Sequence, residues 1–458
     1  MAHLPYDPAL PDLGHILPHG GVPSLVVKAV QGMTSIPFTA EAGEVRYVRY
    51  WPARECIVLW SFPTPYGAPL LVSGRLFGNE GAGLAPTRST LQRLAEECKT
   101  VMPGVASPYR YLYAQQLLLQ LFPLDAGLPG LRFAASGSWM RELFAERLGT
   151  GVAETCTAEV IPSSYKPWRR CVFRFEAQSG EGHARYFGKV FRDSRGQALF
   201  DNLRAINGHL ASVDGAWNIV TPVLYAGGAN LLVFEEAQGG VEVDSEFLGQ
   251  ALDDPLMMEK LRGVVARSVE GLACFQRVPV KGLRYLDPTS VLNQIARRTK
   301  GLDRVAPRVA EAAKRCLRAL EAEAGELKPE SPALTHGAFR HDQFFVSGSA
   351  LFVADLDTLC LSGASADAGN FLAHLDVTAL RHPELRPVVQ EMEGVFIRAL
   401  DSNLYADPRW LDWRRAASDV KYSLRPFLSL SPRWPELTAG LLDAARSHVA
   451  ALGLRKVA

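Results

Sequence analysis

Residues 335–346 read THGAFRHDQFFV, and nine residues after their end the chain continues with DLD (355–357). The four residues before that second motif, LFVA (351–354), are apolar and are typical of the end of a strand. Carboxylates that directly follow a strand suit a hard cation, which takes oxygen ligands. The loop and the strand end together therefore predict a site for a divalent cation.

A small antiparallel sheet is expected upstream of this loop. Its strands are expected at RCVFRFE (170–176), YFGKVF (186–191) and NLLVF (230–234). A helix from about Gln197 to Leu210 lies between the second and third strands. Residues 178–183 supply Gly and Ser for a hairpin between the first two strands. This order places Lys189 on the second strand and Glu235 at the end of the last one.

The same pattern occurs earlier in the chain. YWPARECIV (50–58) corresponds to YKPWRRCVF (165–173), and GRLF (74–77) to GKVF (188–191), so that Arg75 stands where the second copy has Lys189 (189 − 75 = 114). Matches in this order indicate a duplicated unit of domain size rather than a solenoid repeat. Chance similarity between two β-rich segments is the alternative.

From about residue 246 the sequence becomes helical. Residues 247–275 and 305–323 carry apolar residues at a spacing of three to four, and residues 383–452 hold three more helices. Those three are interrupted by Pro408, Pro426, Pro432 and Pro435. The pattern predicts an α+β chain with parts at 1–127, 128–240 and 241–458, the last of which contains the β-rich segment 334–357 and, within it, the loop 335–357.

Composition narrows the function classes. The chain has 458 residues, is 48% hydrophobic, and carries 49 Lys and Arg against 48 Asp and Glu. It can bury several cores, and its net charge of +1 gives no electrostatic basis for binding nucleic acid or a membrane surface. The seven cysteines include no C-x-x-C, and no long apolar run is present, so we expect a soluble, cytoplasmic protein.

On these motifs, residues 128–458 resemble the aminoglycoside phosphotransferase and choline kinase-like family, whose fold is protein kinase-like. In that family the loop is H-G-D-x-x-x-x-N, and an Asp on the next strand binds magnesium. His336, Gly337 and Asp355 match, Gln343 stands for Asn, and Ala338 stands where the catalytic Asp should be. The resemblance implies a bilobal fold with a small antiparallel β lobe and a mostly helical large lobe, preceded here by a duplicated small lobe.

The resemblance also implies ATP and Mg as cofactors and a role for each matching residue. Lys189 would pair with the phosphates, Glu235 would lead to the hinge that meets the adenine, and Asp355 with Gln343 would hold magnesium. The helix at 197–210 contains no Glu to hold Lys189, so Asp201 is the one acid available on it. Arg75 is a poor substitute for a lysine between phosphates, and the first copy is not expected to bind nucleotide in the usual way.

Several positions keep two interpretations. Ser163, Ser164 and Arg169 fall where the family has its phosphate-covering loop, but a plain turn set by Pro167 explains the segment equally well. Asp342, the acid nearest to Ala338, is either a replacement base or an exposed loop residue. His336 and Asp367 are expected to brace the loop, although His336, His341 and Asp342 also form a remote candidate for a transition-metal site.

Three function classes follow. As an enzyme, the chain would phosphorylate a hydroxyl of a small molecule or a modified peptide, slowly because Ala338 cannot accept a proton. As a pseudokinase, it would act as a binding or scaffold protein, with a protein partner on its N-terminal domain. Nucleotidyl transfer on the same fold, with ATP reoriented, is the third class, and in it Ala338 would not matter.

Overall fold

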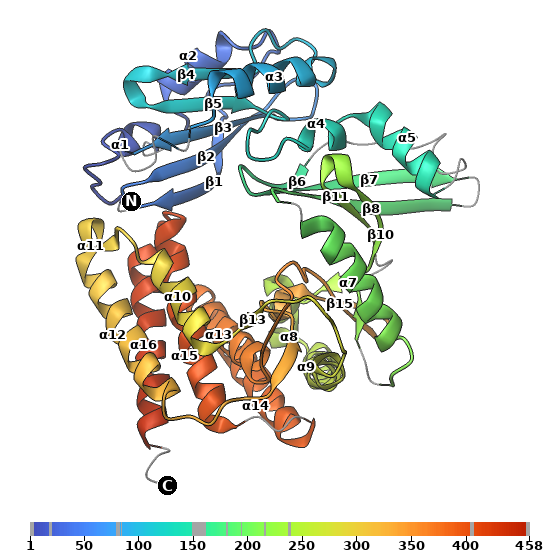
Figure 1. Cartoon of the computed structure of the whole chain (residues 1–458), viewed down its shortest axis with the longest axis vertical. Helices are drawn as coiled ribbons and strands as arrows, with labels where there is room; N and C mark the ends of the chain where they lie inside the picture. Colours follow the sequence, from blue (N-terminus) through green and yellow to red (C-terminus); the bar gives the residue numbers. More distant parts are fainter. Residues whose placement is uncertain are drawn as a thin grey trace. The chain divides into compact units, whose positions relative to one another are not determined.

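The computed structural model describes residues 4–17, 21–78, 83, 85–148, 162–179, 182–193, 195–214, 217–236, 240–403 and 407–454 (Figure 1). It divides into two compact units. The first comprises Met1–Phe200, Pro222–Glu236 and Leu428–Pro432, and the second comprises Asp201–Thr221, Ala237–Phe427 and Arg433–Ala458. Two antiparallel sheets lie in the first unit and most helices in the second, which is the α+β class that the sequence predicted.

The first sheet has five antiparallel strands in the order β1-β2-β3-β5-β4. They are β1 (Glu44–Trp51), β2 (Glu55–Phe62), β3 (Leu70–Phe77), β4 (Tyr109–Leu112) and β5 (Leu117–Leu121). Every residue of β2, β3 and β5 is buried. The helices of this part are α1 (Leu13–Ile16), α2 (Ser24–Gln31) and α3 (Arg88–Cys98). α3 buries Leu91, Leu94 and Cys98, which lie at helical spacing on one face.

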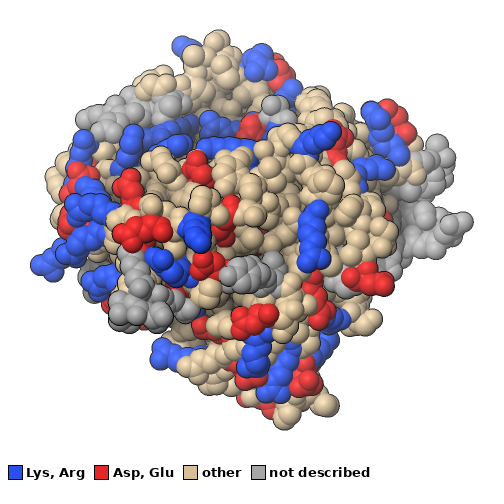
Figure 2. All heavy atoms as spheres, turned by 60° about the horizontal axis from the view of Figure 1, so that its bottom comes forward, with Lys and Arg blue, Asp and Glu red and all other residues tan. Residues whose placement is uncertain are grey.

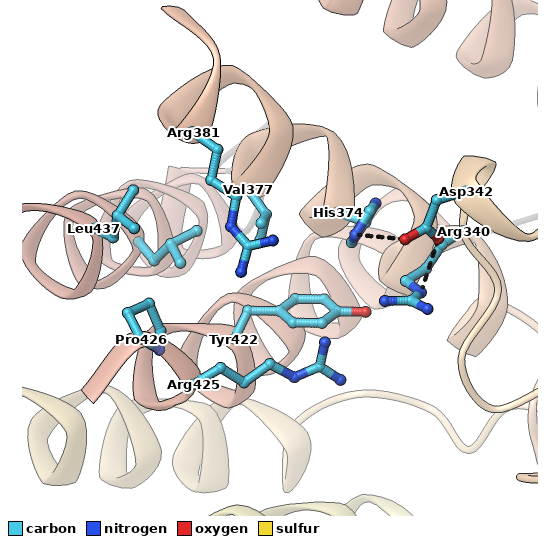
Figure 3. Close-up of a pocket in the computed structure, with 10 residues that line it drawn as sticks. Arg340, Asp342, His374, Val377, Arg381, Tyr422, Arg425, Pro426 and Leu437 are labelled. Atoms are coloured by element: carbon cyan, nitrogen blue, oxygen red, sulfur yellow. Dashed lines mark ion pairs between the residues drawn. The ribbon is translucent and has the colours of Figure 1, made fainter. Parts of the chain in front are cut away.

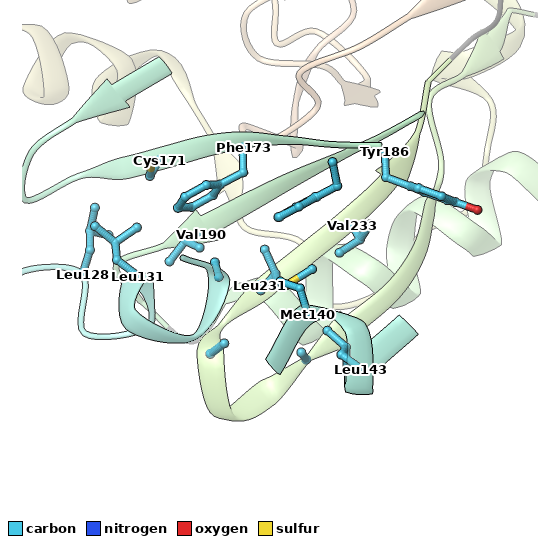
Figure 4. Packing of buried hydrophobic residues seen from close by; sticks show 14 of the residues in the cluster. Leu128, Leu131, Met140, Leu143, Cys171, Phe173, Tyr186, Val190, Leu231 and Val233 are labelled. Carbon is cyan, nitrogen blue, oxygen red and sulfur yellow. The ribbon is translucent and has the colours of Figure 1, made fainter. Parts of the chain in front are cut away.

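The second sheet repeats this order as β6-β7-β8-β11-β10. Its strands are β6 (Pro162–Lys166), β7 (Arg170–Ser179), β8 (Gly182–Phe191), β10 (Pro222–Ala226) and β11 (Leu231–Glu235), accompanied by α4 (Leu131–Ala134), α5 (Gly137–Leu148) and α7 (Arg195–Leu210). Phe173, Tyr186 and Val190 pack with Leu131 and Met140 of α4 and α5 in one buried cluster (Figure 4). The α4 and α5 helices therefore cover one face of this sheet.

A buried aspartate fixes the same turn in both sheets. In the first, Asp7 accepts hydrogen bonds from the Tyr50 hydroxyl at 2.7 Å and from the Ala53 N–H at 2.8 Å. In the second, Asp125 accepts from the Tyr165 hydroxyl and from the Trp168 N–H, both at 2.8 Å. The backbone of Ala53 and of Trp168 is left-handed, with φ of 61° and 63°. These shared features support the duplication, which stays a prediction.

The second unit is mainly helical. Its helices are α8 (Ser245–Asp253), α9 (Pro255–Gln276), α10 (Pro288–Arg298), α11 (Leu302–Val305), α12 (Pro307–Ala324), α13 (Ala366–Arg381), α14 (Arg386–Asn403), α15 (Pro408–Leu428) and α16 (Trp434–Leu454). Two small sheets lie among them. One has the order β12 (Val241–Glu242), β15 (Phe344–Ser347), β16 (Ala350–Val353), β9 (Asn218–Ile219), and the other the order β13 (Tyr285–Leu286), β17 (Cys360–Gly363), β14 (Pro332–Thr335).

Two expectations about the helices were wrong in detail. The helical run at 247–275 is two helices, because Pro255 begins α9 and Asp254 caps it by accepting from the Leu256 N–H. Pro426 does not interrupt a helix but lies inside the last turn of α15. A proline in the last turn removes one hydrogen bond shortly before the helix ends, so the helix tolerates it.

The described surface carries charges of both signs. On the face shown in Figure 2, basic and acidic side chains are interspersed over most of the visible area. None of the helices in the described ranges combines the length and the apolar character that crossing a bilayer requires.

Asp125→Ala tests the turn motif. The change leaves the Tyr165 hydroxyl and the N–H groups of Trp168 and Gly127 without their acceptor, and each buried orphan donor costs about 1–3 kcal/mol. We expect the free energy of unfolding to fall by about 3 kcal/mol or more, measured by urea denaturation. Tyr165→Phe removes only one of the three bonds and should cost about 1 kcal/mol. Equal losses in the two variants would contradict the assignment.

Candidate functional site

The loop at 335–343 is held by a buried carboxylate. Asp367, in the first turn of α13, accepts hydrogen bonds from the backbone N–H of His336 at 2.7 Å and of Gly337 at 2.9 Å. The side chain is fully buried. Burial raises the pKa of Asp367, while the His336 ring and these two N–H groups act in the opposite direction. The bracing role predicted for Asp367 is confirmed.

Gly337 is required by the backbone of this loop. Its φ is +76°, and a Cβ at this position would lie 2.4 Å from the carbonyl oxygen of Thr358. The hydroxyl of Thr358 donates to the carbonyl of His336 at 2.8 Å. The His336 ring Nε2 lies 3.0 Å from the carbonyl oxygen of Ala354, at the end of β16. His336 thus joins the loop to the strand end, as a structural residue would.

The loop and the strand end also meet at Gln343. The N–H of Ala354 donates to the carbonyl of Gln343 at 3.0 Å, so Asp355 directly follows a residue that is bonded to the loop. Asp355 has a left-handed backbone with φ of 63°. A non-glycine residue in this conformation is strained, and such residues gather at functional sites.

The amide of Gln343 faces the loop itself. Hydrogen bonding assigns its Nε2 as donor to the Ala338 carbonyl at 2.6 Å and its Oε1 as acceptor from Arg340 at 3.1 Å. Arg340 therefore donates to the oxygen that was predicted to bind a cation. The same oxygen has a second lone pair, so the role of Gln343 as a metal ligand stays a prediction.

Asp342, which is half-buried, lies beside two buried histidines. Asp342 pairs with Arg340 at 3.2 Å and lies 3.8 Å from His374 of α13. The ring nitrogens of His341 face the Val243 carbonyl at 2.8 Å and the Thr378 hydroxyl at 3.0 Å. Because both nitrogens of His341 are occupied, the remote idea of a transition-metal site with His336 and Asp342 is wrong.

Sequence reasoning missed Lys421 of α15. Its ammonium donates to the side-chain oxygen of Asn370 at 2.6 Å, and the Asn370 amide donates to the carbonyl of Phe339 at 2.8 Å. Burial lowers the pKa of Lys421 to about 7, with Arg425, Arg298 and Arg340 acting in the same direction. Lys421 is thus near its titration midpoint at neutral pH, and the side chain of Asn370 links it to the loop. Nothing in the local sequence distinguishes it from a solvated helix lysine.

The two sheets of the first unit carry a cation at matching positions, but the residues around the two cations differ. Lys189 lies on the central strand β8, between Val172 and Leu232, and is 8% exposed. Arg75 occupies the matching place on β3 and donates to Glu55 at 2.6 Å. The residue that corresponds to Glu55 in the second sheet is Arg170 (170 − 55 = 115). In the first sheet Glu55 therefore neutralises Arg75, whereas the second sheet has Arg170 at the place of Glu55.

The remaining predicted residues of the nucleotide site lie on several elements. Ser164 is on β6, the side chain of Ser163 lies outside the described part, and Arg169 is exposed in the turn between β6 and β7. Glu235 ends β11 and is exposed, and Asp201 is exposed on α7. The turn is fixed by the bond from Trp168 to Asp125, which favours the interpretation as a shared structural turn. The pairing of Asp201 with Lys189 stays a prediction.

One further acidic group is neutralised by an arginine. Ligand atoms of Asp376, Asp419 and His448 lie within 4.8 Å of one another. Arg415 donates to both oxygens of Asp376, at 2.9 and 2.8 Å, and also pairs with Glu393. Because the guanidinium already supplies the positive charge, this group is best described as an ion network that joins α13, α14 and α15.

Comparisons with known proteins give structural matches only. No protein-family model and no curated protein matches the chain. Similar solved structures include an aminoglycoside phosphotransferase in complex with ADP and hygromycin B, at 16% identity over 68% of this chain and 97% of that chain, with a TM-score of 0.45. Another is the choline kinase LicA from Streptococcus pneumoniae, at 11% identity over 68% and 99%, with a TM-score of 0.44. An amicoumacin kinase in complex with AMP-PNP and Ca2+ shares 14% identity over 62% and 88%, with a TM-score of 0.44.

The environment of Lys421 predicts a pH-dependent stability. Its pKa of about 7 in the folded chain lies below the value of about 10 in the unfolded chain, so the unfolded chain binds more protons between these values. The free energy of unfolding should therefore rise with pH in this range, and the penalty for burying the ammonium is largest below about pH 7. We expect Lys421→Met to gain stability relative to the natural chain below pH 7 and to lose this gain towards pH 10. A difference in urea denaturation that is constant across this range would contradict the environment described.

Proposed function

We propose that the chain is an ATP-binding, phosphotransferase-like protein whose loop lacks the proton acceptor. The observation that supports this most is the braced loop: Asp367 holds His336 and Gly337, and His336 in turn contacts the residue before Asp355. This is the place in the motif where the resembling family has its catalytic and magnesium-binding residues. Asp355 has a left-handed backbone, with φ of 63°.

Each residue of this proposal has one physical task. Lys189 supplies a compact positive charge for the phosphates, which the flat guanidinium at Arg75 does not reproduce. Asp355 is the residue that would hold magnesium, and Asp357 offers a second carboxylate nearby in sequence. When bound, magnesium neutralises charge on the phosphate oxygens of ATP. The roles of Asp201, Ser163, Ser164, Arg169 and Glu235 in holding the nucleotide belong to the same proposal.

The missing base distinguishes two versions of the proposal. Ala338 offers only a methyl group, and Asp342 is paired with Arg340 at 3.2 Å, so neither is set up to take a proton from an acceptor hydroxyl. Positioning and charge carry most of the barrier reduction in phosphoryl transfer, and a proton acceptor adds about 10²–10⁴-fold. We therefore favour nucleotide binding with slow or no transfer to the hydroxyl of a small molecule.

Lys189→Ala tests the nucleotide site. We expect Mg-ATP to raise the Tm of the natural chain, because a ligand that binds only the folded state stabilises it, and we expect the variant to lose this rise. The measurement is thermal unfolding with and without Mg-ATP. Arg185→Ala is the matched control, since it removes an exposed cation from the same strand and should keep the rise. A rise that survives in Lys189→Ala would contradict the assigned site.

Ala338→Asp tests the missing base. If the loop is a phosphotransferase loop without its proton acceptor, the variant should gain hydrolysis or transfer of the ATP γ-phosphate, by about 10²-fold or more over the natural chain. Phosphate release and a screen of hydroxylated small molecules are the measurements. Transfer of the nucleotidyl group by the natural chain, unaffected by the substitution, would instead support the third function class. Bound ATP with no gain in either reaction would contradict the proposed loop chemistry.

A further inference from the structure

A small cavity of about 50 Å³ lies in the second unit, between the loop at Arg340 and helices α13, α15 and α16. Its polar lining comes from Arg340, Asp342, His374, Arg381, Tyr422 and Arg425. In Figure 3 the side chains of Arg340, Arg381 and Arg425 are all directed towards the Tyr422 side chain. The nucleotide residues proposed above are not part of this lining.

The lining carries an excess of positive charge. Three arginines face one carboxylate, that of Asp342, which pairs with Arg340. Among the described residues, no carboxylate forms an ion pair with Arg381. Lys421 and Arg425 lie at 5.0 and 4.4 Å from the Tyr422 ring, so a fourth cation stands beside the same aromatic side chain.

The lining also contains a buried histidine, His374, which lies in the field of the same three arginines. Burial holds the pKa of His374 well below its usual range, and His341, Arg340, Arg425 and Arg381 all add to this effect. His374 is 6% exposed and lines the cavity, and its Nδ1 has no hydrogen-bond partner in the described part of the chain. A buried polar atom without a partner in a cationic cavity indicates that a further polar group belongs there.

We propose that this cavity binds the carboxylate or phosphate group of a small molecule. Guanidinium groups bind both kinds of anion through paired N–H donors, and they do so best where water is partly excluded. The volume of about 50 Å³ is several times the roughly 10–15 Å³ that one water molecule needs on the same measure, so it suits a small anionic group. The rest of such a molecule would extend from the cavity, where Arg381 and Arg425 are exposed. This inference does not depend on nucleotide binding.

Calorimetric titration of the full chain at low salt tests the proposal, with inorganic phosphate as one probe and citrate as the other. We expect saturable binding of at least one probe, and binding of phosphate alone or of citrate alone identifies which anion the cavity prefers. Arg381→Gln should weaken this binding about tenfold. Asp342→Asn should strengthen it severalfold, because it removes the single negative charge of the lining.

Two controls separate this site from others. Arg446→Gln removes an arginine of α16 that pairs with Asp443 outside the lining, and it should leave anion binding unchanged. Lys189→Ala should also leave it unchanged, even if it abolishes binding of Mg-ATP. The proposal is overturned if neither probe binds saturably, if Arg381→Gln binds like the natural chain, or if Lys189→Ala alone removes the binding.

Discussion

The two hydrogen bonds from the His336 and Gly337 N–H groups to the Asp367 carboxylate are the constraint on which the described site depends. A carboxylate that is fully buried needs strong donors, and here the donors are backbone groups whose direction sets the path of the loop. The Gly337 conformation, the contact between His336 and Ala354 and the position of Asp355 all follow from that path. None of these contacts involves the side chain of Ala338. The loop therefore keeps its form although the residue expected to accept a proton is absent.

The two sheets of the first unit are built alike but differ at the position of one cation. Both sheets have the same strand order and the same buried aspartate that holds the turn. In the first sheet Arg75 is neutralised by Glu55 and also stacks on Trp168 of the other sheet, at 4.1 Å from its ring. The guanidinium of Arg75 is thus engaged in contacts within the first unit. Lys189 occupies the matching place on β8, and Arg170 stands at the place of Glu55.

Much of the fold and part of the site could be predicted from local patterns. Alternation and hairpin residues identified the strands around Lys189, and the loop motif led to the bracing role of Asp367. The break at Asp254 and Pro255 was missed although an Asp-Pro pair is a helix-start signal, because the apolar spacing continues through it. The environment of Lys421 and the cavity could not be predicted, because they depend on contacts between residues far apart in the sequence. The hydrogen bond from Lys421 to Asn370, for example, joins residues of two different helices.

Hydrogen exchange at the His336 and Gly337 amides tests the central claim most directly, which is that Asp367 holds this loop in place without the catalytic Asp. We expect both amides to exchange slowly in the natural chain, as protected core amides do. Asp367→Asn, which keeps the shape but removes one acceptor oxygen and the charge, should speed exchange at both. Fast exchange of these amides in the natural chain would contradict the account, since it would mean that the loop is not held by this carboxylate.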